Sequence, residues 1–136
     1  MELPMIAMGG FSMALGVWHL GVPVWFHFGR ALDGGARLPA VRAMPVRYGT
    51  TPGDVLGVAW IMNLVASYGL ITIGIAGLAA PLWIETPAGR VLALWIAGWW
   101  FVRAAGQLAM GHRTIDLTVM AWFALLGAVA VAAAVA

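Results

Sequence analysis

The sequence predicts an all-α integral membrane protein that folds as a bundle of four antiparallel transmembrane helices. Of its 136 residues, 63% are hydrophobic and only 9% are charged, whereas a soluble domain carries about 25% charged residues. Four apolar stretches are each long enough for a spanning helix, which needs about 20 residues. The chain has almost no soluble mass besides these stretches, so we expect a single transmembrane domain over residues 1–136.

The predicted spans cover approximately residues 4–28, 55–84, 88–111 and 117–136. The second stretch is longer than a bilayer requires, so this helix should tilt or break near Pro81.

Two of the links carry recognisable helix-start signals. Thr51 precedes Pro52, and Thr86 precedes Pro87. In both pairs the threonine is a suitable N-cap, and proline is favoured at the first helical position. The link over residues 111–116 is short, so the third and fourth helices should be antiparallel neighbours.

The distribution of arginine predicts the orientation in the membrane. All seven basic residues are arginine, and five of them lie in the first and third links. These five are Arg30, Arg37, Arg42, Arg47 and Arg113. The second link offers only Arg90, beside Glu85. The positive-inside rule therefore places the first and third links in the cytoplasm and both termini outside, in what we interpret as a bacterial inner membrane.

The same arginines are not clustered with aromatic residues, as a nucleic-acid surface would need. We therefore expect the lipid bilayer as the partner, with a membrane partner subunit or a second copy of the chain as further candidates, and no nucleic acid. The absence of cysteine excludes disulfides and thiolate metal sites.

The third span contains an arginine well inside an apolar stretch. Trp95, Trp99, Arg103 and Gln107 recur every four residues, so they share one helix face. An arginine at this depth is costly and normally faces a bundle interior with partners. No carboxylate lies deep in any span, so Arg103 has no obvious counter-ion there. The alternative is that its side chain reaches back to the cytoplasmic headgroups.

Polar residues of the first two spans reach a comparable depth. One face of the first span contains Ser12, Gly16, His19, Pro23 and His27. Pro23 should free a backbone carbonyl there. The second span presents Trp60, Asn63 and Ser67, with Tyr68 beside them.

We therefore expect an intramembrane polar cluster that binds a ligand, with Arg103 in hydrogen-bonding or water-bridged reach of His19 and Asn63. Its predicted members are His19, Asn63, Ser67, Tyr68, Trp99, Arg103 and Gln107. For each polar side chain taken alone, the alternative is a structural role as an interhelical hydrogen bond or, for His19, as a neutral buried histidine.

Three classes of function fit this pattern. The first is binding of a small or lipid-like ligand, or docking of a partner membrane subunit, in the polar interior. The second is electron transfer through a b-type haem, with His27 and His112 as ligands because they lie at similar depth. The third is a small transporter or membrane enzyme, although no intramembrane carboxylate and no GxSxG or HExxH motif is present. The sequence assigns no catalytic residue and no metal ligand, and it leaves the cofactor and enzymatic activity open.

Overall fold

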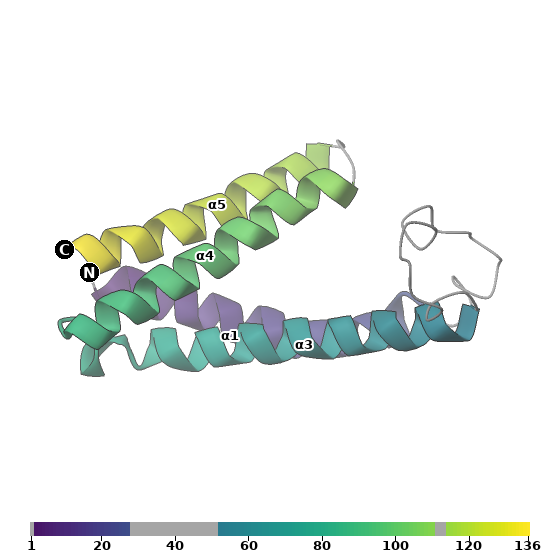
Figure 1. Cartoon of the computed structure of the whole chain (residues 1–136), viewed down its shortest axis with the longest axis horizontal. Coiled ribbons are helices and arrows are strands. Elements are labelled where there is room, and N and C mark those ends of the chain that lie inside the picture. Colours follow the sequence, from purple (N-terminus) through teal and green to yellow (C-terminus); the bar gives the residue numbers. More distant parts are fainter. Residues whose placement is uncertain (1, 28–51, 111–113) are drawn as a thin grey trace. The chain divides into compact units, whose positions relative to one another are not determined.

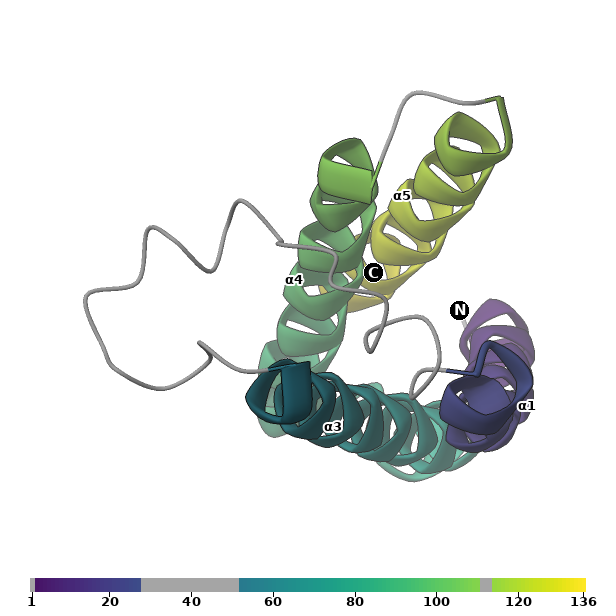
Figure 2. The ribbon, with the colours of Figure 1, turned by 90° about the vertical axis from the view of Figure 1, so that its right-hand side faces the viewer.

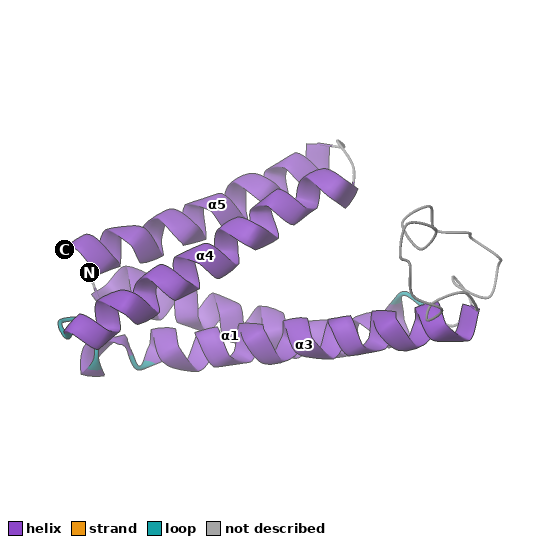
Figure 3. Ribbon diagram, viewed as in Figure 1, coloured by secondary structure: helices purple, strands orange, loops and turns teal. Residues whose placement is uncertain are grey.

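The computed structural model describes residues 2–27, 52–110 and 114–136, and within these ranges it contains helices and no strand (Figures 1 and 3). The helices are α1 (Glu2–Trp25), α3 (Pro52–Leu78), α4 (Pro87–Met110) and α5 (Thr114–Val135), with the short 3-10 helix η2 (Ala80–Leu82). All four α-helices are long and apolar enough to cross a membrane. The prediction of an all-α integral membrane protein with four spanning helices is therefore confirmed, and its helices are in contact with lipid.

The chain forms two compact units. Unit 1 consists of Met1–Ser12 and Ile73–Ala136, and unit 2 consists of Met13–Thr72. The helices α1 and α3 contribute to both units, whereas α4 and α5 belong to unit 1. The single domain expected from the sequence stays a prediction. The orientation also stays a prediction, because the five arginines of the first and third links lie outside the described residues.

The helix α3 ends before Pro81, near which a break was predicted. Its last residue is Leu78, and η2 follows with Pro81 as its second residue. The break near Pro81 is confirmed, and the helix is shorter than the predicted span to residue 84, because proline cannot donate the backbone hydrogen bond of a continuing helix. The indole Nε1 of Trp83 donates to the carbonyl oxygen of Ala76 at 2.9 Å. This bond satisfies one of the carbonyls left open in the last turn of α3.

The start of α4 follows the predicted threonine-proline pattern. Pro87 is its first residue, and the hydroxyl of Thr86 accepts a hydrogen bond from the backbone N–H of Gly89 at 2.9 Å. Thr86 is therefore an N-cap, as expected. Pro52 is likewise the first residue of α3, whereas its predicted cap Thr51 lies outside the described residues.

In unit 1 the helices α4 and α5 lie side by side and antiparallel, as the short link predicts (Figures 1 and 2). Ala93, Ile96 and Trp100 form the buried face of α4, and Phe123 and Ala130 are buried on α5. Their spacing of three, four and seven residues is that of one face of a helix.

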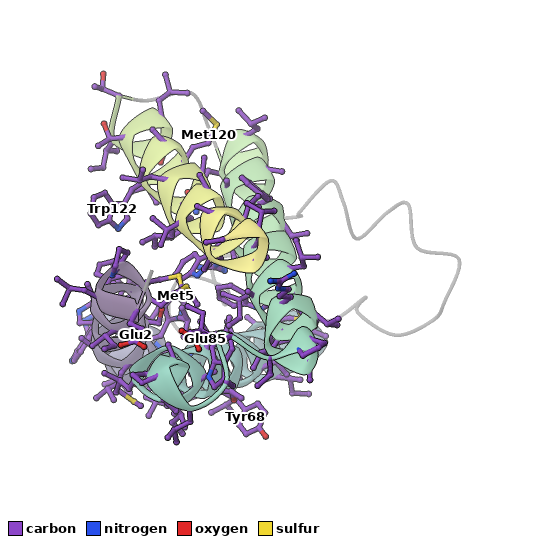
Figure 4. The ribbon with its side chains drawn as sticks, turned by 90° about the vertical axis from the view of Figure 1, so that its left-hand side faces the viewer. Glu2, Met5, Tyr68, Glu85, Met120 and Trp122 are labelled. Carbon is purple, nitrogen blue, oxygen red and sulfur yellow. The ribbon has the colours of Figure 1, made fainter. Side chains whose placement is uncertain are left out.

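The first turns of α1 also belong to unit 1, where they approach the end of α3 closely. A Cβ atom added to Gly9 would lie 2.6 Å from the backbone nitrogen of Leu78 and 2.7 Å from the carbonyl carbon of Gly77. The two backbones are therefore in contact, which small residues permit in membrane helices. Met5, one turn earlier, is fully buried and projects from α1 toward α5 (Figure 4).

Candidate functional site

His19 and Asn63 form a reciprocal pair between α1 and α3 in unit 2. The side-chain Nδ2 of Asn63 donates to the backbone carbonyl oxygen of His19 at 2.9 Å, and its Oδ1 lies 3.0 Å from the ring Nδ1 of His19. The His19 carbonyl is open to this contact because Pro23, four residues later in the same helix, has no N–H to donate. The carbonyl expected to be freed by Pro23 therefore receives its donor from Asn63.

This geometry also determines where His19 carries a proton. A carbonyl oxygen only accepts hydrogen bonds, so the group of Asn63 that faces the His19 carbonyl is its NH₂. The amide oxygen of Asn63 therefore faces the ring, and the ring Nδ1 must be the donor. Nδ1 of His19 is protonated in either charge state of the ring.

The other two predicted residues of α3 have different surroundings. Ser67 is fully buried, and its hydroxyl donates to the carbonyl oxygen of Asn63 at 2.8 Å. This is a bond to the preceding turn of the same helix, so it ties Ser67 to its own backbone. Tyr68 is 73% exposed, and its side chain extends outward from α3 (Figure 4). Unit 2 thus brings together His19 and Asn63, with Ser67 one turn along α3, and does not bring Tyr68 to them.

Arg103 lies between two aromatic rings in unit 1. Its guanidinium carbon is 5.7 Å from the ring centroid of Trp99 on α4 and 5.6 Å from that of Phe123 on α5. Both distances are within the range of about 6 Å for cation–π attraction. The side chain is half-buried, and Gln107, one turn further along α4, is half-buried as well. The structure thus brings together Trp99 and Arg103, as their spacing predicts.

Trp100 is the central residue of this region. It is fully buried, and its ring centroid lies 6.4 Å from Phe11 of α1, 5.1 Å from Trp99 and 5.2 Å from Phe123. Trp100 and Phe123 were not among the predicted members of the site. The inner face of α4 was predicted to follow the stripe of Trp95, Trp99, Arg103 and Gln107, whereas Trp95 is 53% exposed.

The buried face of α4 is a second stripe with the same helical spacing, made only of apolar residues. Its members are apolar residues of mixed size at spacings of three and four, namely Gly89, Ala93, Ile96, Trp100 and Ala104. The stripe that contains Arg103 flanks this face. Arg103 therefore lies at the margin of the core of unit 1, between the fully buried Trp100 and the surface.

Two buried nitrogen atoms in this region have no hydrogen-bond acceptor among the residues that the structure describes. They are the indole Nε1 of Trp100 and the guanidinium Nε of Arg103. A buried donor without an acceptor costs about 1–3 kcal/mol, and more when the group is charged. Trp100 and Arg103 are three residues apart on α4, so their side chains lie on neighbouring parts of one helix surface.

The expected contact of Arg103 with His19 and Asn63 stays a prediction, because Arg103 belongs to unit 1 and the other two residues to unit 2. The amide of Asn63 already uses its nitrogen and its oxygen in contacts with His19.

The proposed haem ligands do not gain support. His27 follows the end of α1, is exposed, and donates from Nδ1 to the carbonyl oxygen of Val24 at 2.9 Å. His112 lies outside the described residues. Within the described ranges, no three or more His, Cys, Asp or Glu side chains are grouped as metal ligands.

Comparison of the chain with known protein families, with curated proteins and with solved structures finds no match. The functional proposal therefore rests on the geometry of two groups of side chains. These are the His19–Asn63 pair in unit 2, and Trp100 with Arg103 in unit 1.

Proposed function

We propose that this small integral membrane protein binds a lipid-like ligand within the membrane and that Arg103 anchors this ligand. The observation that carries the proposal is the buried Nε of Arg103, which has no acceptor among the described residues. An arginine at the centre of a spanning helix costs about 2.5–3.5 kcal/mol on insertion scales, and this value is an upper bound for Arg103, which lies closer to one end of α4. A residue with this cost requires compensation from its surroundings.

The aromatic rings compensate for only part of the cost. Cation–π attraction from Trp99 and Phe123 is worth about 0.5–2 kcal/mol per contact and acts on the positive charge. It does not replace hydrogen bonds, because the five N–H donors of the guanidinium lie in its plane and each needs an acceptor in that plane. What Nε of Arg103 lacks among the described residues is an acceptor, and a negatively charged acceptor would also offset the charge of the guanidinium.

The chain has no acidic residue deep within a span. Its five acidic residues are Glu2, Asp33, Asp54, Glu85 and Asp116. They fall in the links or in the first turn of a helix. Arg103 lies seven residues before the end of α4 at Met110, which corresponds to about 10 Å along the helix axis. A ligand that partitions into the bilayer can bring an acceptor to this depth.

Native mass spectrometry of the protein released from mixed-lipid nanodiscs tests the proposal. The discs would contain phosphatidylcholine with a fraction of phosphatidylglycerol, and the bound species would be counted for wild type and for Arg103→Gln. We expect wild type to retain a bound lipid that Arg103→Gln loses. Arg90→Gln, at the other end of α4, is the matched control and should behave as wild type. Equal retention by wild type and Arg103→Gln would exclude Arg103 as the anchor.

The docking of a partner subunit would meet the same need if that subunit supplied the acceptor. The same spectra separate the two functions, because a partner appears as a protein adduct and a lipid as a small one. No observation in the described residues favours haem binding, transport or catalysis over ligand binding.

A further inference from the structure

The second orphaned donor makes the ligand more specific than Arg103 alone would. Trp100 is fully buried, and its Nε1 has no acceptor among the described residues, as is the case for Nε of Arg103. An indole N–H is a donor only, and so is every nitrogen of a guanidinium. A single group that satisfies both must therefore offer at least two acceptor lone pairs.

We propose that Trp100 and Arg103 form a donor pair for the oxyanion headgroup, a carboxylate or a phosphate, of an acyl-chain amphiphile. This inference rests on the proposed function and adds the headgroup chemistry and the second donor. An oxyanion offers two or more acceptor oxygens on one atom, so it has enough acceptors for both nitrogens. It also carries the charge opposite to that of Arg103, and hydrogen bonds between charged groups are shorter and stronger than neutral ones.

The surroundings of the donor pair suit an apolar chain attached to that headgroup. The rings of Phe11 and Phe123 pack against Trp100, and Phe11 also meets Trp122 of α5 edge to face, with centroids 5.7 Å apart. A soluble anion would have to leave water to enter this aromatic environment, whereas an amphiphile reaches it from the bilayer. Arg103 is only half-buried, so its guanidinium is the more accessible of the two donors.

Isothermal titration of the purified protein in maltoside micelles tests the headgroup. The probes are dodecanoate, dodecyl phosphate, dodecanol and inorganic phosphate. We expect saturable binding of the two anionic amphiphiles, with dodecanol at least about tenfold weaker, since a hydrogen bond to a charged group is worth roughly that factor or more. If dodecanol binds as tightly as dodecanoate, the site does not require an oxyanion. If inorganic phosphate binds as tightly as dodecyl phosphate, the site does not require an acyl chain.

The second donor is tested with a pair of tryptophan variants. Trp100→Phe retains an aromatic ring and removes the N–H, so it should weaken dodecanoate binding about tenfold. Trp95→Phe, on the exposed side of the same helix, should leave binding unchanged. Unchanged binding by Trp100→Phe would remove Trp100 from the site and leave Arg103 as the sole anchor.

A measurement on the unaltered protein covers the case in which Trp100→Phe does not fold. The indole N–H proton of Trp100 should move downfield in the NMR spectrum when dodecanoate is added, because it gains a charged acceptor. A shift with dodecanol of the same size, or none with dodecanoate, contradicts the donor pair. The proposed function itself would fail by a different result, in which wild type retains no lipid from nanodiscs and binds none of the amphiphiles.

Discussion

The contact between His19 and Asn63 predicts a specific loss of stability and a specific rescue. Asn63→Leu keeps the side-chain volume similar and removes both contacts of the amide with His19. Interhelical hydrogen bonds in membranes contribute about 0.6 kcal/mol on average and up to about 1.7, so the loss of two should cost about 1–3 kcal/mol. The cost arises because Pro23 supplies no N–H, so the His19 carbonyl loses its donor.

The rescue follows from the same cause. Adding Pro23→Ala to Asn63→Leu restores a backbone N–H four residues after His19, and this N–H can donate to the orphaned carbonyl. We expect the double variant to regain about half of the lost stability, because one of the two hydrogen bonds is replaced within the helix. Pro23→Ala alone should have a much smaller effect on stability than Asn63→Leu.

Unfolding by titration with sodium dodecyl sulfate in mixed micelles, followed by circular dichroism, measures these free energies. Ser67→Ala is the matched control, because Ser67 is fully buried one turn from Asn63 and bonds only to its own helix. It should cost less than about 0.5 kcal/mol, since such bonds to the preceding turn do not stabilise helices. If Asn63→Leu is no less stable than Ser67→Ala, or if Pro23→Ala does not rescue it, the reciprocal pair does not hold α1 against α3.

Three further predictions concern the structure of both units. Gly9→Ala should destabilise the protein by about 1–3 kcal/mol, because the added carbon would overpack against backbone atoms that cannot move aside. Gly10→Ala should not destabilise it, because nothing lies within 4 Å of the added carbon. The same unfolding titration measures both variants. Thr86→Ala should cost about 1 kcal/mol through loss of the N-cap of α4, and Thr86→Ser should retain most of that stability. The ¹⁵N NMR spectrum of labelled His19 should show a protonated Nδ1, and an unprotonated Nδ1 would contradict the orientation of the Asn63 amide deduced above.

Much of the fold could be predicted because membrane helices are encoded locally. An apolar stretch of sufficient length predicts a span without knowledge of the neighbouring helices, and the pair Thr86-Pro87 predicts the first turn of α4 from adjacent residues alone. The freed carbonyl at His19 was likewise predictable, since it depends only on Pro23. Its donor was not, because the pairing of His19 with Asn63 depends on how α1 and α3 meet.

The candidate site was harder to predict for the same reason. Polarity identified Arg103, and helical spacing identified its contact with Trp99. The more deeply buried neighbours Trp100 and Phe123 carry no polar signal that distinguishes them from core residues, and Phe123 lies on another helix. Tyr68 was assigned by its polarity and its proximity to Ser67, but adjacent residues on a helix point about 100° apart, and Tyr68 is mostly exposed.

The His19–Asn63 pair and the Trp100–Arg103 pair differ in how completely the described residues satisfy their hydrogen bonds. In unit 2, Asn63 supplies the donor that the carbonyl of His19 needs and the acceptor that its ring Nδ1 needs, so the pair is sufficient to explain its own presence in the membrane. In unit 1, Trp100 and Arg103 contribute donors that no described residue accepts. A chain under selection for stability alone would replace such residues with apolar ones of similar volume, which is frequently neutral or stabilising. Within the described residues the cost of these two donors has no compensation, so the proposed ligand should be sought first at Trp100 and Arg103.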